Sequence, residues 1–227
     1  MADILMVIAP EDFRDEEYFH TREELEKVGY KISVASLKDV ARSSVEKKEV
    51  VVDVLIEEVD VADYDALVLV GGNGAKVYFE DEKVLEMCYQ TYEQGKVLGA
   101  ICIAPGILAR AGVLAGKKAT SFASERETLD ESGAITSDSH VVVDGQIVTA
   151  DGPEVAHEFG IKVAEALKQN LASLHDESSD ENSDEEEGYY PKDSDDEDDD
   201  SDDGFPENKA YYGEEDKKHE KRVSEEE

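Results

Sequence analysis

Cys102 lies at a predicted sharp turn between a strand and a helix, a position that can expose a sulfur nucleophile. The segment Ala100-Ile101-Cys102-Ile103-Ala104 places a small residue two positions before and after the cysteine, at the end of an apolar run. Small side chains let the strand and helix backbones of a nucleophile elbow approach closely. Unpaired N–H groups at the start of the following helix favour a thiolate, so we expect an exposed thiol with a lowered pKa. The alternative is a small buried hydrophobe, a common role of free cysteine.

A glycine-rich turn supplies a second candidate feature. Gly71-Gly72-Asn73-Gly74 follows an apolar strand that we expect beside the strand of Cys102. Its backbone N–H groups would then lie near the sulfur and form an oxyanion hole, although a tight turn alone also explains the glycines. The run has neither G-x-G-x-x-G spacing nor the G-K-[ST] of a phosphate loop, so no nucleotide cofactor is predicted.

Two acidic residues could complete the site. Glu16 and Glu17 begin the first predicted helix at the same edge of the sheet, so one of them could face the sulfur. A carboxyl close to a thiolate tends to take up a proton, because the two like charges repel, and it would then donate a hydrogen bond. Acids at a helix start also serve simply as partners of the helix dipole.

The remaining cysteine and the histidines are weaker candidates. Cys88 lies inside a predicted helix, where we expect it to pack, and its spacing to Cys102 indicates neither a disulfide framework nor a metal site. Among the histidines, His157 is best placed to approach the site, because it follows the loop Asp151-Gly152-Pro153. We nevertheless favour a plain surface or capping role for it over an approach to the site. The other histidines are His20, His140, His175 and His219.

The elements that must position these residues alternate between strand and helix. Apolar runs predict strands at 4–9, 30–35, 65–70 and 96–101, with one or two short strands within 50–59. Helices are predicted from 15 to Gly29 and at 81–94, 102–110, 124–132 and 155–171, and Asp144-Gly145 predicts a hairpin. Continuous apolar strands indicate a mostly parallel sheet buried on both faces, hence a three-layer α/β sandwich. Ligands of such sheets bind at the carboxyl ends of the strands.

Charge divides the chain into two parts. Residues 1–171 are mixed and periodic, whereas residues 172–227 hold 25 Asp and Glu against 6 Lys and Arg, in a chain of formal net charge −35. Such a segment buries too little apolar surface to offset its ordering entropy, so an acidic disordered tail is predicted. The acidity argues against nucleic acid and anionic membranes as partners. With no signal peptide or bilayer-length apolar run, we expect a cytoplasmic protein.

Four motifs in order resemble the DJ-1/PfpI superfamily, in particular its archaeal PfpI-like members. They are Phe13-Arg14-Asp15-Glu16-Glu17, Val68-Leu69-Val70-Gly71-Gly72-Asn73, Gly99-Ala100-Ile101-Cys102-Ile103-Ala104-Pro105 and Ala111-Gly112-Val113-Leu114-Ala115-Gly116-Lys117-Lys118-Ala119-Thr120. The resemblance spans residues 3 to about 171. It implies a flavodoxin-like sandwich, a homo-oligomer that is a dimer or a larger ring, and no cofactor or metal. It also implies Cys102 as nucleophile, Glu17 as its acidic partner, and Gly72 and Ile103 as backbone donors.

The chain departs from the family pattern at its histidines. Protease-like members have a histidine immediately after the cysteine, where this chain has Ile103, and another branch has one where Phe122 stands. Neither replacement accepts a proton, so an ordinary Cys-His pair is absent from these positions.

These observations lead to one leading hypothesis and two alternatives. The first is a cysteine-dependent enzyme of the PfpI type, in which the thiolate of Cys102 attacks a carbonyl of a reactive aldehyde, glycated group or peptide. Protease, glyoxalase and deglycase activities all fall within this chemistry. The second is a non-catalytic redox sensor or chaperone that uses oxidation of Cys102. The third is a carrier domain whose acidic tail binds a basic partner.

Overall fold

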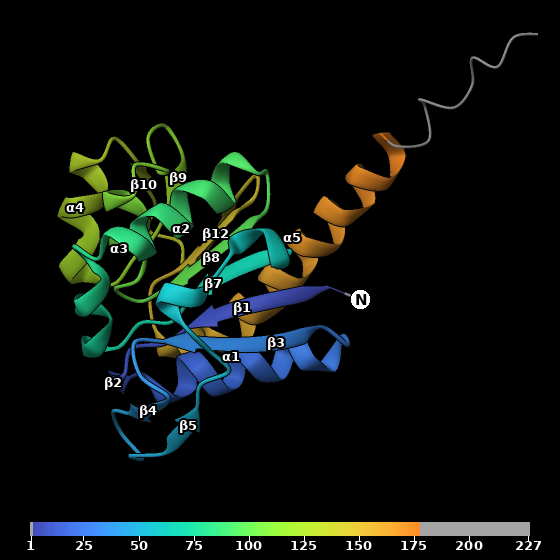
Figure 1. Ribbon diagram of the computed structural model, residues 1–227. Helices are drawn as coiled ribbons and strands as arrows, with labels where there is room; N and C mark the ends of the chain where they lie inside the picture. Colours follow the sequence, from blue (N-terminus) through green and yellow to red (C-terminus); the bar gives the residue numbers. More distant parts are fainter. Residues whose placement is uncertain (1, 178–227) are drawn as a thin grey trace, which may run out of the picture. The chain divides into compact units, whose positions relative to one another are not determined.

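A seven-stranded sheet with the order β11-β12-β8-β7-β1-β3-β6 forms the centre of the domain. The computed structural model describes residues 2–177, and the sheet runs through the middle of the ribbon in Figure 1. All neighbouring pairs are parallel except β11 and β12, which form the hairpin predicted from Asp144-Gly145. The strands of this sheet are β1 (Asp3–Val7), β3 (Lys31–Ser36), β6 (Val54–Leu55), β7 (Ala66–Leu69), β8 (Val97–Ile101), β11 (Val141–Asp144) and β12 (Ile147–Ala150).

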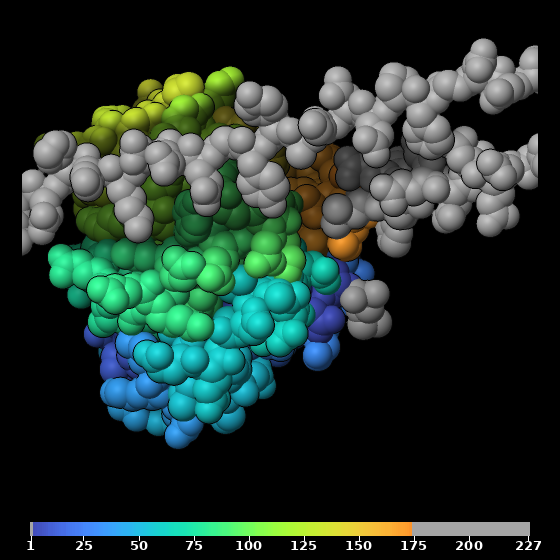
Figure 2. All heavy atoms as spheres, turned by 45° about the horizontal axis from the view of Figure 1, so that its top comes forward, coloured from blue at the N-terminus to red at the C-terminus, as the bar shows by residue number. Residues whose placement is uncertain are grey.

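Helices cover both faces of the sheet, as the continuous apolar strands predict. On one side α1 (Asp15–Lys27) packs along α5 (Ala156–Glu177), and α5 contacts β8 and β12. On the other side lie α2 (Glu82–Glu93), α3 (Pro105–Arg110) and α4 (Arg126–Glu131), with α2 against β7 and β8. Figure 2 shows this second face, covered by α2 and the cyan 3-10 turns that precede it. The predicted three-layer α/β sandwich is confirmed.

Two smaller sheets were not anticipated from the sequence. One has the order β2-β4-β5, formed by β2 (Glu11–Phe13), β4 (Val40–Ser43) and β5 (Glu49–Val51), and the other pairs β9 (Lys118–Ala119) with β10 (Ile135–Thr136). Strands of two to four residues are too short to show an alternating pattern. The β2-β4-β5 sheet matters for the site, because it lies directly after β1 and brings the 43–49 loop beside the start of α1.

The ends of the elements differ in places from the prediction. The helix expected over 102–110 begins only at Pro105, because Cys102, Ile103 and Ala104 form a turn. The closing helix expected over 155–171 continues to Glu177. Of the disordered tail predicted over 172–227, the first part, 172–177, is helical instead, and the rest, from residue 178 onward, lies outside the described residues. Among residues 2–177, no helix is long and apolar enough to cross a membrane.

The carboxyl ends of β1, β7 and β8 meet at one edge of the sheet, because the three strands are parallel neighbours. The chain leaves β7 through the glycine-rich turn, and leaves β8 through Cys102. The turn is held against β2: a Cβ atom built on Gly74 would collide with the carbonyl oxygen of Glu11 and lie 2.9 Å from the Cβ of Ala9. Close backbone contact therefore requires a glycine at position 74.

We expect Gly74→Ala to lower the free energy of unfolding by about 2–3 kcal/mol, because the added methyl must push β2 away from the turn. The matched control is Gly95→Ala, where a Cβ meets nothing within 4 Å and only the left-handed φ of +69° is strained. Its cost should be about 1 kcal/mol. Urea unfolding measures both, and equal losses would contradict the close contact at Gly74.

Candidate active site

Cys102 occupies a strained turn between β8 and α3. Its φ of 64° lies in the left-handed region, which non-glycine residues seldom adopt. Two backbone hydrogen bonds hold this conformation: the N–H of Cys102 donates to the carbonyl oxygen of Ala150 (2.8 Å), and its carbonyl accepts from the N–H of Phe122 (2.7 Å). The predicted nucleophile elbow is present, and strain of this kind is typical of functional sites.

The thiol differs from the prediction in exposure and in acidity. Cys102 is only 9% exposed and lies at a pocket of about 590 Å³, so the expectation of an exposed thiol is wrong. Burial, followed by the nearby Glu17, raises the pKa of Cys102 to about 12, whereas the N–H groups of Gly72 and Ile103 lower it. The expected lowering of this pKa is therefore also wrong. Helix α3 begins only at Pro105, three residues after the cysteine.

Backbone donors reach the sulfur from two sides. The N–H groups of Gly72, after β7, and of Ile103, after β8, lie near enough to the thiol of Cys102 to lower its pKa. Gly72 has a φ of +89°, and a Cβ on it would lie 2.5 Å from the backbone nitrogen of Arg14. A Cβ on Gly71 would lie 2.6 Å from Oε2 of Glu17 and 2.8 Å from the Cβ of Cys102. Both glycines are needed for this close approach, and the two predicted donors face the sulfur.

Of the two acidic candidates, Glu17 faces the thiol. Glu17 is fully buried in the first turn of α1, and burial raises the pKa of its carboxyl to about 7. The thiol of Cys102 and the N–H of Gly71 are its polar neighbours and lower this pKa, yet within residues 2–177 neither carboxyl oxygen has a well-aligned hydrogen bond. Glu16 instead points to the surface, where its Oε2 lies 2.7 Å from Nε of Arg14.

The histidines lie away from the sulfur. His157, the best placed of the histidines in the sequence, stacks on His20 with ring centroids 4.2 Å apart and bonds Glu24 through Nδ1 (2.7 Å). It lines no part of the pocket at Cys102, which agrees with the surface role favoured from the sequence. The reason is that η5 (Pro153–Val155) carries the chain over the pocket, and α5 then turns His157 toward α1.

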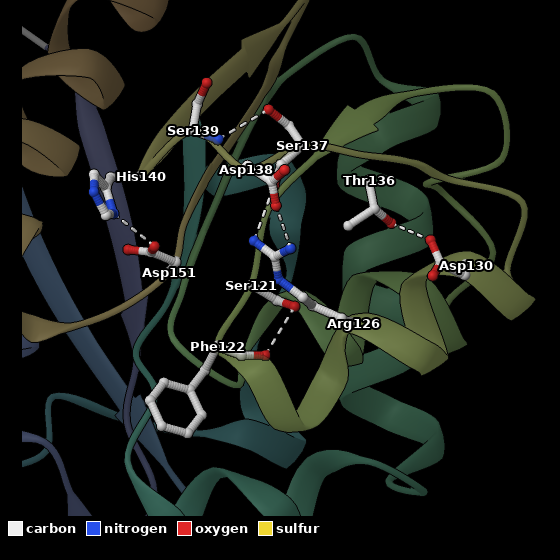
Figure 3. A network of polar contacts seen from close by, with 10 residues as sticks. All are labelled: Ser121, Phe122, Arg126, Asp130, Thr136, Ser137, Asp138, Ser139, His140 and Asp151. Carbon is white, nitrogen blue, oxygen red and sulfur yellow. Dashed lines mark hydrogen bonds and ion pairs between the residues drawn. The ribbon is translucent and has the colours of Figure 1, made fainter.

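A different histidine lies beside a neighbouring pocket. His140 and Asp151 flank the β11–β12 hairpin, and Nδ1 of His140 lies 2.8 Å from Oδ2 of Asp151 (Figure 3). They line a pocket of about 670 Å³ that shares Phe122 and Glu154 with the pocket at Cys102. The predicted hairpin could have indicated this pair. Its strand register pairs Val141 with Ala150, which places His140 and Asp151 opposite each other just beyond the strand ends.

Polar residues from several loops surround the pocket at Cys102. Ser44 comes from the loop after β4, and Asn73 and Lys76 come from η3 (Asn73–Tyr78). Phe122, half exposed, and Glu154 line it as well. Sequence reasoning missed Ser44 because β4 was not anticipated, and it assigned no role to Lys76. Among residues 2–177, no three His, Cys, Asp or Glu side chains group in a way that could hold a metal ion.

Comparisons with known proteins agree with this fold. A family model described as the DJ-1/PfpI family matches residues 2–166. An uncharacterized protein of Methanocaldococcus jannaschii is 42% identical over 172 residues, covering 74% of this chain and 84% of that protein. A deglycase of Thermococcus kodakarensis is 33% identical over 149 residues, covering 66% and 90%. The crystal structure of a ThiJ/PfpI domain protein from Brachyspira murdochii matches with a TM-score of 0.71 and 30% identity, covering 74% and 96%.

We expect Glu17→Gln to stabilise the protein in a pH-dependent way. Glu17 has a folded pKa of about 7, above the ordinary value of 4.5, so the folded state binds more protons between these two values and loses stability as the pH rises through them. A shift of this size corresponds to about 3 kcal/mol at pH 8. Glutamine carries no charge to bury, so urea unfolding should show the variant gaining stability relative to wild type between pH 4.5 and 8. Glu16→Gln is the matched control, and equal pH profiles for Glu17→Gln and wild type would contradict the raised pKa.

Glu17→Gln should also lower the pKa of Cys102. Ionised Glu17 is one cause of the raised thiol pKa, so removing its charge should lower that pKa by about one unit or more. The rate of iodoacetamide labelling at Cys102, followed by peptide mass spectrometry over a pH series, measures this shift. Glu16→Gln should leave the profile unchanged. A thiol pKa that stays the same in Glu17→Gln would show that the two groups do not interact.

Proposed function

This chain belongs to the DJ-1/PfpI family, and we propose that it is a cysteine-dependent enzyme that acts on the carbonyl group of reactive aldehydes or of the adducts they form. Cys102 is the proposed nucleophile and Glu17 the proposed proton carrier. The observation that carries the proposal is the contact between a strained, pocket-lining thiol and a buried carboxyl whose pKa is raised to about 7. The deglycase name of relatives such as the one from Thermococcus kodakarensis supports this class of substrate.

Glu17 supplies the base that the missing histidines would otherwise provide. A general base works best when its pKa lies near the operating pH, and burial brings the pKa of Glu17 there. When the proton of the thiol moves to Glu17, the repulsion between two negative charges disappears. The protonated carboxyl and the N–H groups of Gly72 and Ile103 then stabilise the thiolate. The nucleophile therefore forms by proton transfer within the pair, an uphill step because the thiol is the weaker acid of the two groups.

The proposed reaction on an α-oxoaldehyde balances without an external oxidant. The sulfur of Cys102 bonds to the aldehyde carbon, and the carbonyl oxygen, stabilised by the backbone donors, takes the proton from Glu17 to give a hemithioacetal. Glu17 then takes the proton from this carbon and returns it to the neighbouring carbon through an enediol, while the hydroxyl proton of the adduct passes to the oxygen of the neighbouring carbon. The product is a thioester of a 2-hydroxy acid. Water cleaves the thioester, releasing the acid and returning the proton to the thiol.

Peptide hydrolysis and redox sensing have less support. Amide hydrolysis requires protonation of a poor leaving group. At the two positions where branches of the family carry a histidine, this chain has Ile103 and Phe122. Oxidation-sensing cysteines are accessible and have a low pKa, whereas Cys102 is 9% exposed and its pKa is raised. A homo-oligomeric state and a cytoplasmic location stay predictions from the sequence.

Turnover of methylglyoxal to lactate tests the proposal. We expect Cys102→Ser to reduce kcat/KM by about 1,000-fold or more, and Glu17→Gln by about 100-fold, the range for loss of a general acid-base group. Cys88→Ala is the matched control: Cys88 is buried in α2 and its substitution should leave kcat/KM near that of wild type once folding is verified. Equal turnover by wild type and Cys102→Ser would contradict the proposed function.

A further inference from the structure

Cationic side chains line the Cys102 pocket although the chain as a whole is strongly acidic. The protein carries a formal net charge of −35, which repels small anions at long range. Nevertheless, two cationic side chains, Arg14 and Lys76, line the pocket beside the thiol. They lie on neighbouring segments, because the N–H of Arg14 donates to the carbonyl oxygen of Gly71 (3.2 Å) at the start of the turn that leads to Lys76.

Lys76 differs from Arg14 in its ionic partners. Arg14 is paired with Glu16 at 2.7 Å. Within the part of the chain that the structure describes, no carboxylate lies at ion-pair distance from Lys76. The ammonium group is exposed and faces the solvent of the pocket. An unpaired cation beside a reactive group is available to bind an anion.

A second observation points to a ligand in the same pocket. The hydroxyl oxygen of Ser44 is buried and has no hydrogen-bond partner within residues 2–177, although Ser44 lines the pocket. Its backbone is fixed by donation of its N–H to the carbonyl oxygen of Phe13 (2.8 Å), just before Arg14. A buried hydroxyl without a partner costs free energy unless a ligand supplies one. The side chain of Asn73 lines the pocket beside Lys76 and offers a further amide donor.

From this arrangement we propose that Lys76, with Ser44 and Asn73, binds an anionic group of the substrate, a carboxylate or phosphate, while its carbonyl group faces Cys102. The inference deepens the proposed function by naming the substrate class as anionic carbonyl compounds. Glu154, which lines the pocket from η5, carries the opposite charge. It repels the anionic group, so that the substrate is oriented with its charge toward Lys76.

Two alkylating reagents that differ in charge test the site without any turnover. Iodoacetate carries a carboxylate and iodoacetamide does not, while both transfer an equivalent group to sulfur and release iodide. We expect Lys76→Gln in the full chain to lower the ratio of the iodoacetate rate to the iodoacetamide rate at Cys102 by about five-fold. Lys118→Gln is the matched control, because it removes the same charge from an exposed lysine that does not line the pocket. An unchanged ratio, or an equal fall in both variants, would overturn the proposal.

Protection experiments identify the anion. Glyoxylate carries a carboxylate, glyceraldehyde 3-phosphate carries a phosphate, and glyceraldehyde is neutral; each aldehyde adds reversibly to a thiol. We expect at least one anionic aldehyde to protect Cys102 from iodoacetamide about five-fold better than glyceraldehyde does, with the advantage lost in Lys76→Gln. The anionic aldehyde that protects better shows whether the site prefers a carboxylate or a phosphate. If neither protects better than glyceraldehyde does, the proposal is overturned.

The outcome also separates this inference from the proposed function. If the ratio of the iodoacetate to the iodoacetamide rate depends on Lys76 but methylglyoxal turnover survives Cys102→Ser, the anion site is established and the proposed catalytic role is overturned. If turnover requires Cys102 but the ratio does not depend on Lys76, the proposed function is supported and the anion site is overturned.

Discussion

The close approach of the Glu17 carboxyl to the Cys102 sulfur is the contact on which the architecture of the site depends. A buried carboxyl beside a buried thiol is unfavourable whenever both are ionised, because neither charge is solvated. The surrounding backbone is arranged to tolerate this pair. Gly71 leaves room between the two groups, since any Cβ there would lie 2.6 Å from the carboxyl and 2.8 Å from the Cβ of Cys102. The pair then shares one proton, which is the chemically useful state.

Packing remote from the sulfur fixes the position of Glu17. Helix α1 lies along α5, and Gly160 permits a close contact, because a Cβ on it would lie 2.9 Å from the Cβ of Glu24 and 3.0 Å from the carbonyl oxygen of Thr21. The hydroxyl of Thr21 donates to the carbonyl oxygen of Ala156 (3.3 Å) at the start of α5. These contacts set the height of α1 over the sheet edge. Stability of the helical layer and the chemistry of the site are therefore coupled through one helix.

The sequence predicted the parts of the site that depend on strand order, but it did not predict those that depend on burial. Continuous apolar runs placed β7 beside β8, and that order brings Gly72 and Cys102 together. The acidity of the thiol could not be obtained in the same way, because it follows from the depth of the pocket and from which of two adjacent glutamates points inward. Ser44 was missed because the short β2-β4-β5 sheet leaves no periodic pattern. His157 has the surface position favoured from the sequence, because the loop that passes over the pocket directs the next helix away from it.

The interlocking of three chain segments at Gly71 and Gly72 bears on protein engineering. Gly71 accommodates Glu17 from α1 and Cys102 from the turn after β8, while Gly72 abuts the backbone of Arg14 and directs its N–H to the sulfur. Because each segment fills the space that the others leave, the site cannot be transplanted piecemeal. A cysteine grafted onto the elbow of another scaffold would acquire the bend but lack the shared proton. The smallest portable unit comprises the ends of all three parallel strands, β1, β7 and β8, together with the first turn of α1.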